Sequence, residues 1–156
     1  ANVLPNSPPT LAPIPNQEIT LGQTLVFTAS ASDTNVPEQT LYFSLGADAP
    51  AGAGINAVTG ECFWTPASAP ATNTFTVQVS DDGVPSLGAT QSVTVTVWLP
   101  PTLGVQVSGD QLLLTWPRGM LQEAADVAGP YQDVPTPSPF PVDLTETARF
   151  YRLRVP

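Results

Sequence analysis

The chain has 156 residues, enough for one ordinary domain or two small ones, and its formal net charge is −9 at pH 7. Only 11% of the residues are charged and 42% are hydrophobic, which excludes a charged helical protein and a disordered acidic tail. The negative charge argues against binding to nucleic acid, and no apolar run is long enough to cross a bilayer. With no His, no Lys and a single Cys, the chain lacks most side chains that carry catalysis, so we expect no enzyme.

The composition and the local patterns predict strands from the start of the chain. Nineteen prolines, with Thr- and Val-rich runs between them, favour short strands over long helices. Residues 1–9, rich in Pro and Asn, are expected to form a linker or an edge segment. Alternating segments with turn signals then recur at the spacing of a β-sandwich; they cover residues 17–21, 24–32, 41–45, 61–65, 73–80 and 90–98. The first module is therefore expected at residues 10–99.

Two of these segments predict which side chains face the core. Apolar residues occupy every second position, and Thr occupies many of the positions between them. The residues expected to point inward are Phe75, Val77 and Val79 in one segment and Val93, Val95 and Val97 in the other. This pattern indicates two packed antiparallel sheets.

A second, smaller β module is expected at residues 102–156. The run LPPT at 99–102 cannot extend a strand ladder and marks the boundary. Strand-like pieces follow at residues 103–108, 111–116, 120–124, 140–144 and 149–155. The stretch MLQEAADVA could form a helical turn, but its flanking pieces favour a strand. At about 55 residues this module is marginal alone, so docking against the first is plausible.

The runs TGECFWTP and NTFTVQVSDDGVPSLGATQSVTVTV resemble bacterial cadherin-like, immunoglobulin-type repeats, over about residues 6–98. Residues 112–155 resemble, more weakly, the small C-terminal β modules of secreted multidomain bacterial proteins. The resemblance implies an all-β chain: an antiparallel Ig-like or cadherin-like sandwich followed by a smaller sandwich-like module. Where such repeats place an apolar residue two before the Trp, this chain has Cys62, which we expect to be a small buried hydrophobe on the same face as Trp64.

Cadherin-type repeats bind calcium with acidic loops and a linker Asn, and the resemblance carries this site to four positions: Asn6, Asp33, Asn35 and Asp81. Calcium takes six to eight oxygen ligands, and the end of a sandwich brings separated loops together. The competing interpretation is that these residues are ordinary turn formers, since Asp and Asn are common in turns. The chain requires no cofactor under either interpretation, and calcium is the one candidate.

The resemblance also implies the role of the chain: a non-catalytic structural or adhesive segment of a larger secreted or surface protein, extracellular or on a bacterial cell. Its partners would be neighbouring domains, copies of itself, or surface glycans. Residues 1–15 could pair with a sheet edge of a neighbouring copy and build fibres. The alternative is a carbohydrate-binding accessory domain of a secreted hydrolase, with Phe63, Tyr131 or Tyr151 stacking on sugar rings.

Overall fold

The computed structural model describes residues 5–109, 111–143 and 148–155. The chain divides into two compact units, Ala1–Leu99 and Pro100–Pro156, called unit 1 and unit 2 below. The described residues form strands and turns, and they contain no helix long and apolar enough to span a membrane. The predicted all-β fold is confirmed.

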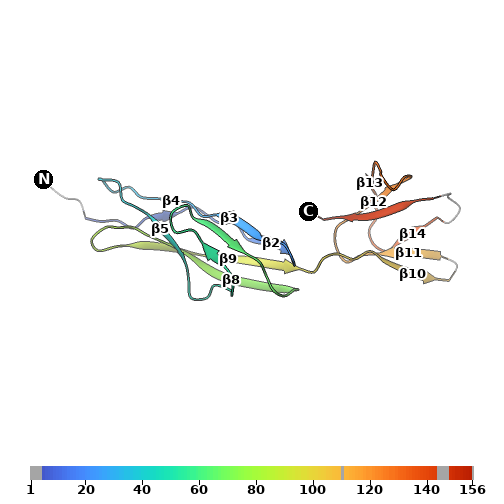
Figure 1. The fold of residues 1–156 in the computed structure, drawn as a ribbon, viewed down its shortest axis with the longest axis horizontal. Coiled ribbons are helices and arrows are strands. Elements are labelled where there is room, and N and C mark those ends of the chain that lie inside the picture. The colour runs from blue at the N-terminus through green and yellow to red at the C-terminus, as the bar shows by residue number, and fades with distance from the viewer. Residues whose placement is uncertain (1–4, 110, 144–147, 156) are drawn as a thin grey trace. The chain divides into compact units, whose positions relative to one another are not determined.

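Unit 1 is a sandwich of two main sheets (Figure 1). One sheet has the order β2-β9-β8-β5 and the other β3-β7-β6, while β1 and β4 form a separate pair. All pairings are antiparallel except that of β2 with β9, which is parallel. The strands are β1 (Thr10–Leu11), β2 (Gln17–Thr20), β3 (Leu25–Thr28), β4 (Ala31–Ser32), β5 (Tyr42–Leu45), β6 (Gly54–Ile55), β7 (Glu61–Trp64), β8 (Ala71–Ser80) and β9 (Gly88–Trp98).

The core of unit 1 is built on the long hairpin of β8 and β9. The two strands are in register from Ala71 opposite Val97 to Ser80 opposite Gly88. Six inward side chains are each at most 2% exposed, as the alternation predicted: Phe75, Val77, Val79, Val93, Val95 and Val97. Burying one such side chain contributes about 1.5–3 kcal/mol, so this hairpin supplies much of the stability of unit 1.

Strand β7 carries the unusual cysteine. Cys62 is 0% exposed and Trp64 is 4% exposed, so both face the core, as expected. The indole Nε1 of Trp64 donates a hydrogen bond to the backbone oxygen of Ala51 at 3.2 Å. Burial raises the pKa of the Cys62 thiol to about 11, so the thiol stays protonated at neutral pH. Cys62 therefore acts as a small apolar side chain.

Gly60 explains how the chain enters β7. Its φ is +71°, a conformation that favours glycine, and a Cβ at this position would overlap the backbone oxygen of Ala29. The backbone N–H of Ala29 donates to the oxygen of Gly60 at 2.9 Å. The two backbones approach closely here, between the end of β3 and the start of β4. This contact is where the strand predicted at residues 24–32 is interrupted.

Unit 2 is a smaller pair of three-stranded sheets, with orders β10-β11-β14 and β13-β12-β15 (Figure 1). Among the described residues, its buried core cluster consists of Leu114, Leu121 and Val134 and is much smaller than that of unit 1. MLQEA forms a strand, as the flanking pieces indicated. The strands are β10 (Gly104–Ser108), β11 (Gln111–Thr115), β12 (Met120–Ala124), β13 (Gln132–Asp133), β14 (Phe140–Val142) and β15 (Phe150–Arg154).

Candidate functional site

The N-terminal segment of unit 1 runs beside β9 over the length of the sandwich. Asn6 Nδ2 donates to the backbone oxygen of Pro85, in the loop before β9, at 2.8 Å. The N–H of Leu21 donates to the oxygen of Trp98, at the end of β9, at 2.8 Å. Since β9 runs from Gly88 to Trp98 and a strand rises about 3.3 Å per residue, these two contacts lie roughly 30 Å apart. The chain therefore enters unit 1 at one end and leaves at the other (Figure 1).

Asp81, which follows β8, organises the loop that joins β8 to β9. Its Oδ1 accepts hydrogen bonds from the backbone N–H of Gly83 at 3.0 Å and of Leu87 at 2.9 Å. Its Oδ2 accepts from Asn6 Nδ2 at 3.0 Å. Asp81 is 3% exposed. Burial opposes its ionisation, but the three donors outweigh burial and hold the pKa of the carboxyl below its usual value.

Asn6 and Asn35 line the same hollow at this end of unit 1. Its volume is about 390 Å³, and Gln39 and Asp82 also line it. Gln39 Nε2 donates to Asn6 Oδ1 at 2.8 Å, so both ends of the Asn6 amide are engaged. Asn35 Oδ1 accepts from the hydroxyl of Ser7 at 2.8 Å. The two asparagines thus tie the N-terminal segment to the loops.

Asp33 supplies the remaining predicted position. Its Oδ1 accepts from the backbone N–H of Asn35 at 2.9 Å, a short turn of the kind that Asp residues form. Its Oδ2 is buried and has no hydrogen-bond partner in the described part of the chain, and the same holds for Gln39 Oε1. A buried carboxylate oxygen without a donor is a suitable cation ligand.

All four predicted residues therefore lie at the N-terminal end of unit 1, joined in pairs by hydrogen bonds. Among the described residues, no three His, Cys, Asp or Glu side chains are close enough together to hold a metal ion. A cation here would need amide and backbone oxygens beside the carboxylates. Gln39 was not predicted. Asp82 Oδ1 accepts from the N–H of Thr40 at 2.9 Å, a contact that no local pattern indicates because the two residues are far apart in sequence.

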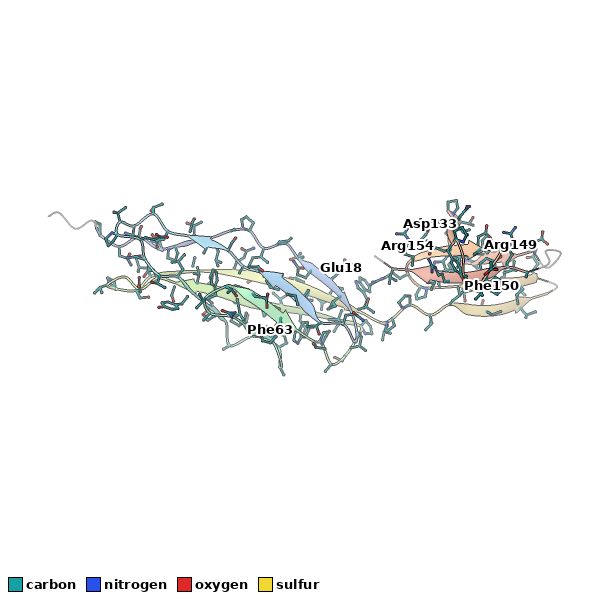
Figure 2. All side chains as sticks on the ribbon, turned by 45° about the horizontal axis from the view of Figure 1, so that its top comes forward. Glu18, Phe63, Asp133, Arg149, Phe150 and Arg154 are labelled. Carbon is teal, nitrogen blue, oxygen red and sulfur yellow. The ribbon has the colours of Figure 1, made fainter. Side chains whose placement is uncertain are left out.

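The three aromatic residues considered for sugar binding differ in exposure and contacts. Phe63 is 48% exposed on the outer face of β7, in register with Val26, and its ring covers Gly54 (Figure 2). The ring of Tyr131 is covered by the guanidinium of Arg152, 4.0 Å from its centroid. The ring of Tyr151 packs against Phe140, with 6.0 Å between centroids. Phe63 is thus the candidate with the most open ring face.

A chain of polar contacts joins β12, β13 and β15 in unit 2, and Figure 2 labels two of its members, Asp133 and Arg154. Arg152 Nε donates to Gln122 Oε1 at 2.8 Å, and Gln122 Nε2 donates to Asp133 Oδ1 at 2.7 Å. Arg154 Nη2 contacts Asp133 Oδ2 at 2.6 Å. The bonds from Gln122 and Arg154 lower the pKa of Asp133. Arg152 and Arg154 occupy alternate, exposed positions of β15.

Residues 8–98, more than half of the chain, match the family described as "Putative Ig domain". The chain belongs to this family. Its domains are typically structural or adhesive, generally non-catalytic and typically extracellular. The predicted relationship to Ig-like and cadherin-like repeats is confirmed. No curated protein sequence matches the chain.

Solved structures resemble the fold. Extracellular cadherin domains 3–6 of protocadherin gamma B2 are 17% identical with a TM-score of 0.50, covering 77% of this chain and 40% of that one. Domains EC21–23 of human CDH23 are 16% identical with a TM-score of 0.45, covering 83% of this chain and 61% of that one. A nucleoside hydrolase-related hypothetical protein from Saccharophagus degradans is 21% identical with a TM-score of 0.47, covering 59% of this chain and 26% of that one. This chain thus spans less than two thirds of each of these proteins.

Proposed function

We propose that the chain is a non-catalytic structural or adhesive segment of an extracellular or bacterial surface protein, with unit 1 acting as a stiff spacer. The supporting observation is the path of the chain through unit 1, in at one end and out at the other. A domain with this path adds its full length to a series of domains. A domain with adjacent ends would instead hang from the chain as a side branch.

The strand pairing favours resistance to tension. β2 is parallel to β9, with Gln17 opposite Val95 and Thr20 opposite Trp98. A load on the two ends of unit 1 pulls β2 and β9 in opposite directions along their length. The backbone hydrogen bonds between them lie across this direction, so they must break together rather than one by one.

Single-molecule force spectroscopy of the full chain tests this role. One attachment pair, Pro5→Cys with Leu99→Cys, loads β2 against β9. A second pair, Pro5→Cys with Val84→Cys, loads two points at the same end of unit 1. We expect a clearly higher unfolding force for the first pair. Equal forces for the two pairs would overturn the spacer role.

Calcium at the N-terminal end of unit 1 is a separate proposal. It rests on the convergence of Asn6, Asp33, Asn35 and Asp81 and on the buried Asp33 Oδ2 without a donor. Millimolar calcium should raise the unfolding midpoint, magnesium should not, and Asp33→Asn should remove the effect. An unchanged midpoint would leave these residues as turn formers.

Assembly into fibres also stays a proposal. In the described part of the N-terminal segment, β1 pairs with β4, and the N–H of Ala12 donates to the oxygen of Ser30 at 2.8 Å. These bonds use the segment within its own unit; residues 1–4 lie outside the described residues. Electron microscopy of concentrated protein is the test, with fibres expected and monodisperse particles contradicting the proposal.

Carbohydrate binding is the second candidate function, favoured by the exposed ring of Phe63 next to Val26. A half-exposed aromatic ring on a sheet face can stack on a sugar ring. The chain should then be retained on at least one insoluble polysaccharide, and Phe63→Ala should abolish retention without changing the fold. Val58→Ala, at an exposed valine in the turn before β7, is the matched control. No retention across a broad panel would exclude this function.

A further inference from the structure

Strand β10 of unit 2 is an edge strand whose core-facing side chains are uncovered. Val105 lies opposite Leu114 of β11, and Val107 lies opposite Leu112. Residues opposite each other in a sheet point to the same face, so both valines point to the core side. Leu114 is only 5% exposed, but Val105 is 62% and Val107 is 77% exposed. The inner face of β10 therefore extends beyond the core that covers its neighbour.

The backbone of β10 has a free edge as well. Among the described residues, β10 pairs with β11 alone. Ser108 and Gln111 are the last partners of the ladder and are separated by two positions in sequence, and a closing pair at this spacing exchanges both of its hydrogen bonds. The alternation of the ladder then points the N–H and C=O groups of Val105 and Val107 away from β11. The strand GVQVS has no charge, proline or bulge, which are the usual protections of an edge.

We propose that β10 pairs antiparallel with the β10 of a second copy of this chain, about a twofold axis at Gln106. This register places Val105 opposite the partner's Val107. Both residues present outward N–H and C=O groups, so two such pairs form four hydrogen bonds and use every outward group of Val105 and Val107. A strand shifted by one residue would leave these groups unmatched.

The strand itself supports a second copy as the occupant, because Val105 and Val107 flank Gln106 symmetrically and the strand is therefore complementary to a copy of itself. Unit 2 is also the part of the chain where two copies repel each other least: residues 102–156 carry six carboxylates and four arginines, whereas the seven carboxylates of residues 1–101 have no Lys or Arg. The pairing also brings four exposed valine side chains together on the inner face of the joined sheet. Apolar contact and backbone bonding thus favour the same partner in the same register.

Disulfide trapping tests the register. At the twofold axis, Gln106 faces the partner's Gln106 in a non-hydrogen-bonded pair, with Cα atoms about 4.5 Å apart. That separation suits a disulfide, so the full chain with Gln106→Cys should form a covalent dimer under mild oxidation. Ser108→Cys is the matched control, because the two Ser108 positions would lie about 13 Å apart. The native Cys62 is 0% exposed and should not react.

Sedimentation equilibrium of the full chain tests the pairing itself. We expect reversible dimers that Val105→Pro abolishes, because proline removes an outward N–H that the monomer does not use. Val105→Thr, which keeps that N–H, should still dimerise. The proposal is overturned by a monomer at about 1 mM, by dimers unaffected by Val105→Pro, or by equal crosslinking at positions 106 and 108. If unit 1 of the same chain covered β10, the protein would stay monomeric and the proposal would be overturned.

Discussion

Units 1 and 2 hold their carboxylates in different ways. Residues 1–101 contain seven Asp or Glu and no Lys or Arg, whereas all four arginines lie in residues 102–156. In unit 1, Asp81 is held by backbone and amide N–H groups, and Asp48 Oδ2 accepts from the hydroxyl of Thr76 at 2.8 Å. In unit 2, Asp133 is held by Gln122 and by Arg154. A domain can thus stabilise buried or loop carboxylates without cations if its loops supply enough neutral donors.

The two cores also differ in size, and the largest predicted effect follows from this. Phe75 is 0% exposed, so Phe75→Ala should lower the free energy of unfolding of unit 1 by about 3–5 kcal/mol. Calorimetry with tryptophan fluorescence measures the loss. A change below about 1 kcal/mol would contradict the placement of Phe75 in the core.

Leu121→Ala should lower the free energy of unfolding of unit 2 by about 2–5 kcal/mol. Leu121 is 0% exposed and belongs to the small core cluster that the described part of unit 2 forms with Leu114 and Val134, so this loss should unfold unit 2. The amide spectrum of unit 1 by NMR should keep its dispersed signals. Loss of dispersion in both units would show that they do not fold independently.

A pH-dependent effect is expected at Asp81. Because its pKa is lowered in the folded chain, Asp81 stabilises unit 1 at pH above the ordinary Asp value of 3.8, and this stability is lost as the pH falls toward the folded pKa. Asp81→Asn should lower the unfolding midpoint at neutral pH, because the amide NH₂ of Asn would replace a carboxylate oxygen that accepts a hydrogen bond. The unfolding midpoint of this variant should also change less as the pH falls. Asp82→Asn is the control, because Asn keeps an oxygen for Thr40. Identical acid profiles for the wild type and Asp81→Asn would refute the role of Asp81.

The smallest effect is expected at the ion pair of unit 2. The side chains of Arg154 and Asp133 are 57% and 43% exposed, so water and salt screen their attraction. Arg154→Gln should lower the midpoint of unit 2 slightly at low salt and not at high salt. Asp81→Asn in unit 1 should be nearly independent of salt. If the effects of Arg154→Gln and Asp81→Asn on the unfolding midpoint depended equally on salt, the proposed difference between the two units would be wrong.

The alternation in the sequence was sufficient to predict the longer strands and the inward faces of β8, β9 and β7. The two-residue strands β1, β6 and β13 were missed, because so short a strand has no period and exists only through its partner. The break between β3 and β4 depends on the approach of Gly60, about thirty residues later. These features follow from tertiary contacts that no local window contains.

The candidate site could likewise be predicted only in part from the sequence. The grouping of Asn6 with Asp81 and of Asp33 with Asn35 followed from the family resemblance and the turn positions. The contribution of Gln39 and the direction of the Asn6 amide, with its nitrogen toward Asp81, could not be predicted. The orientation of an amide depends on the donors and acceptors around it, and those around Asn6 come from two separate loops.

The spacer role requires the two ends of unit 1 to be far apart, and one distance measures this directly. Spin labels at Pro5→Cys and Leu99→Cys, with the buried Cys62 left unlabelled, report the distance by pulsed electron paramagnetic resonance. The path along β9 predicts a narrow distribution centred above about 30 Å. A distribution centred below about 20 Å would place both ends together and contradict the account.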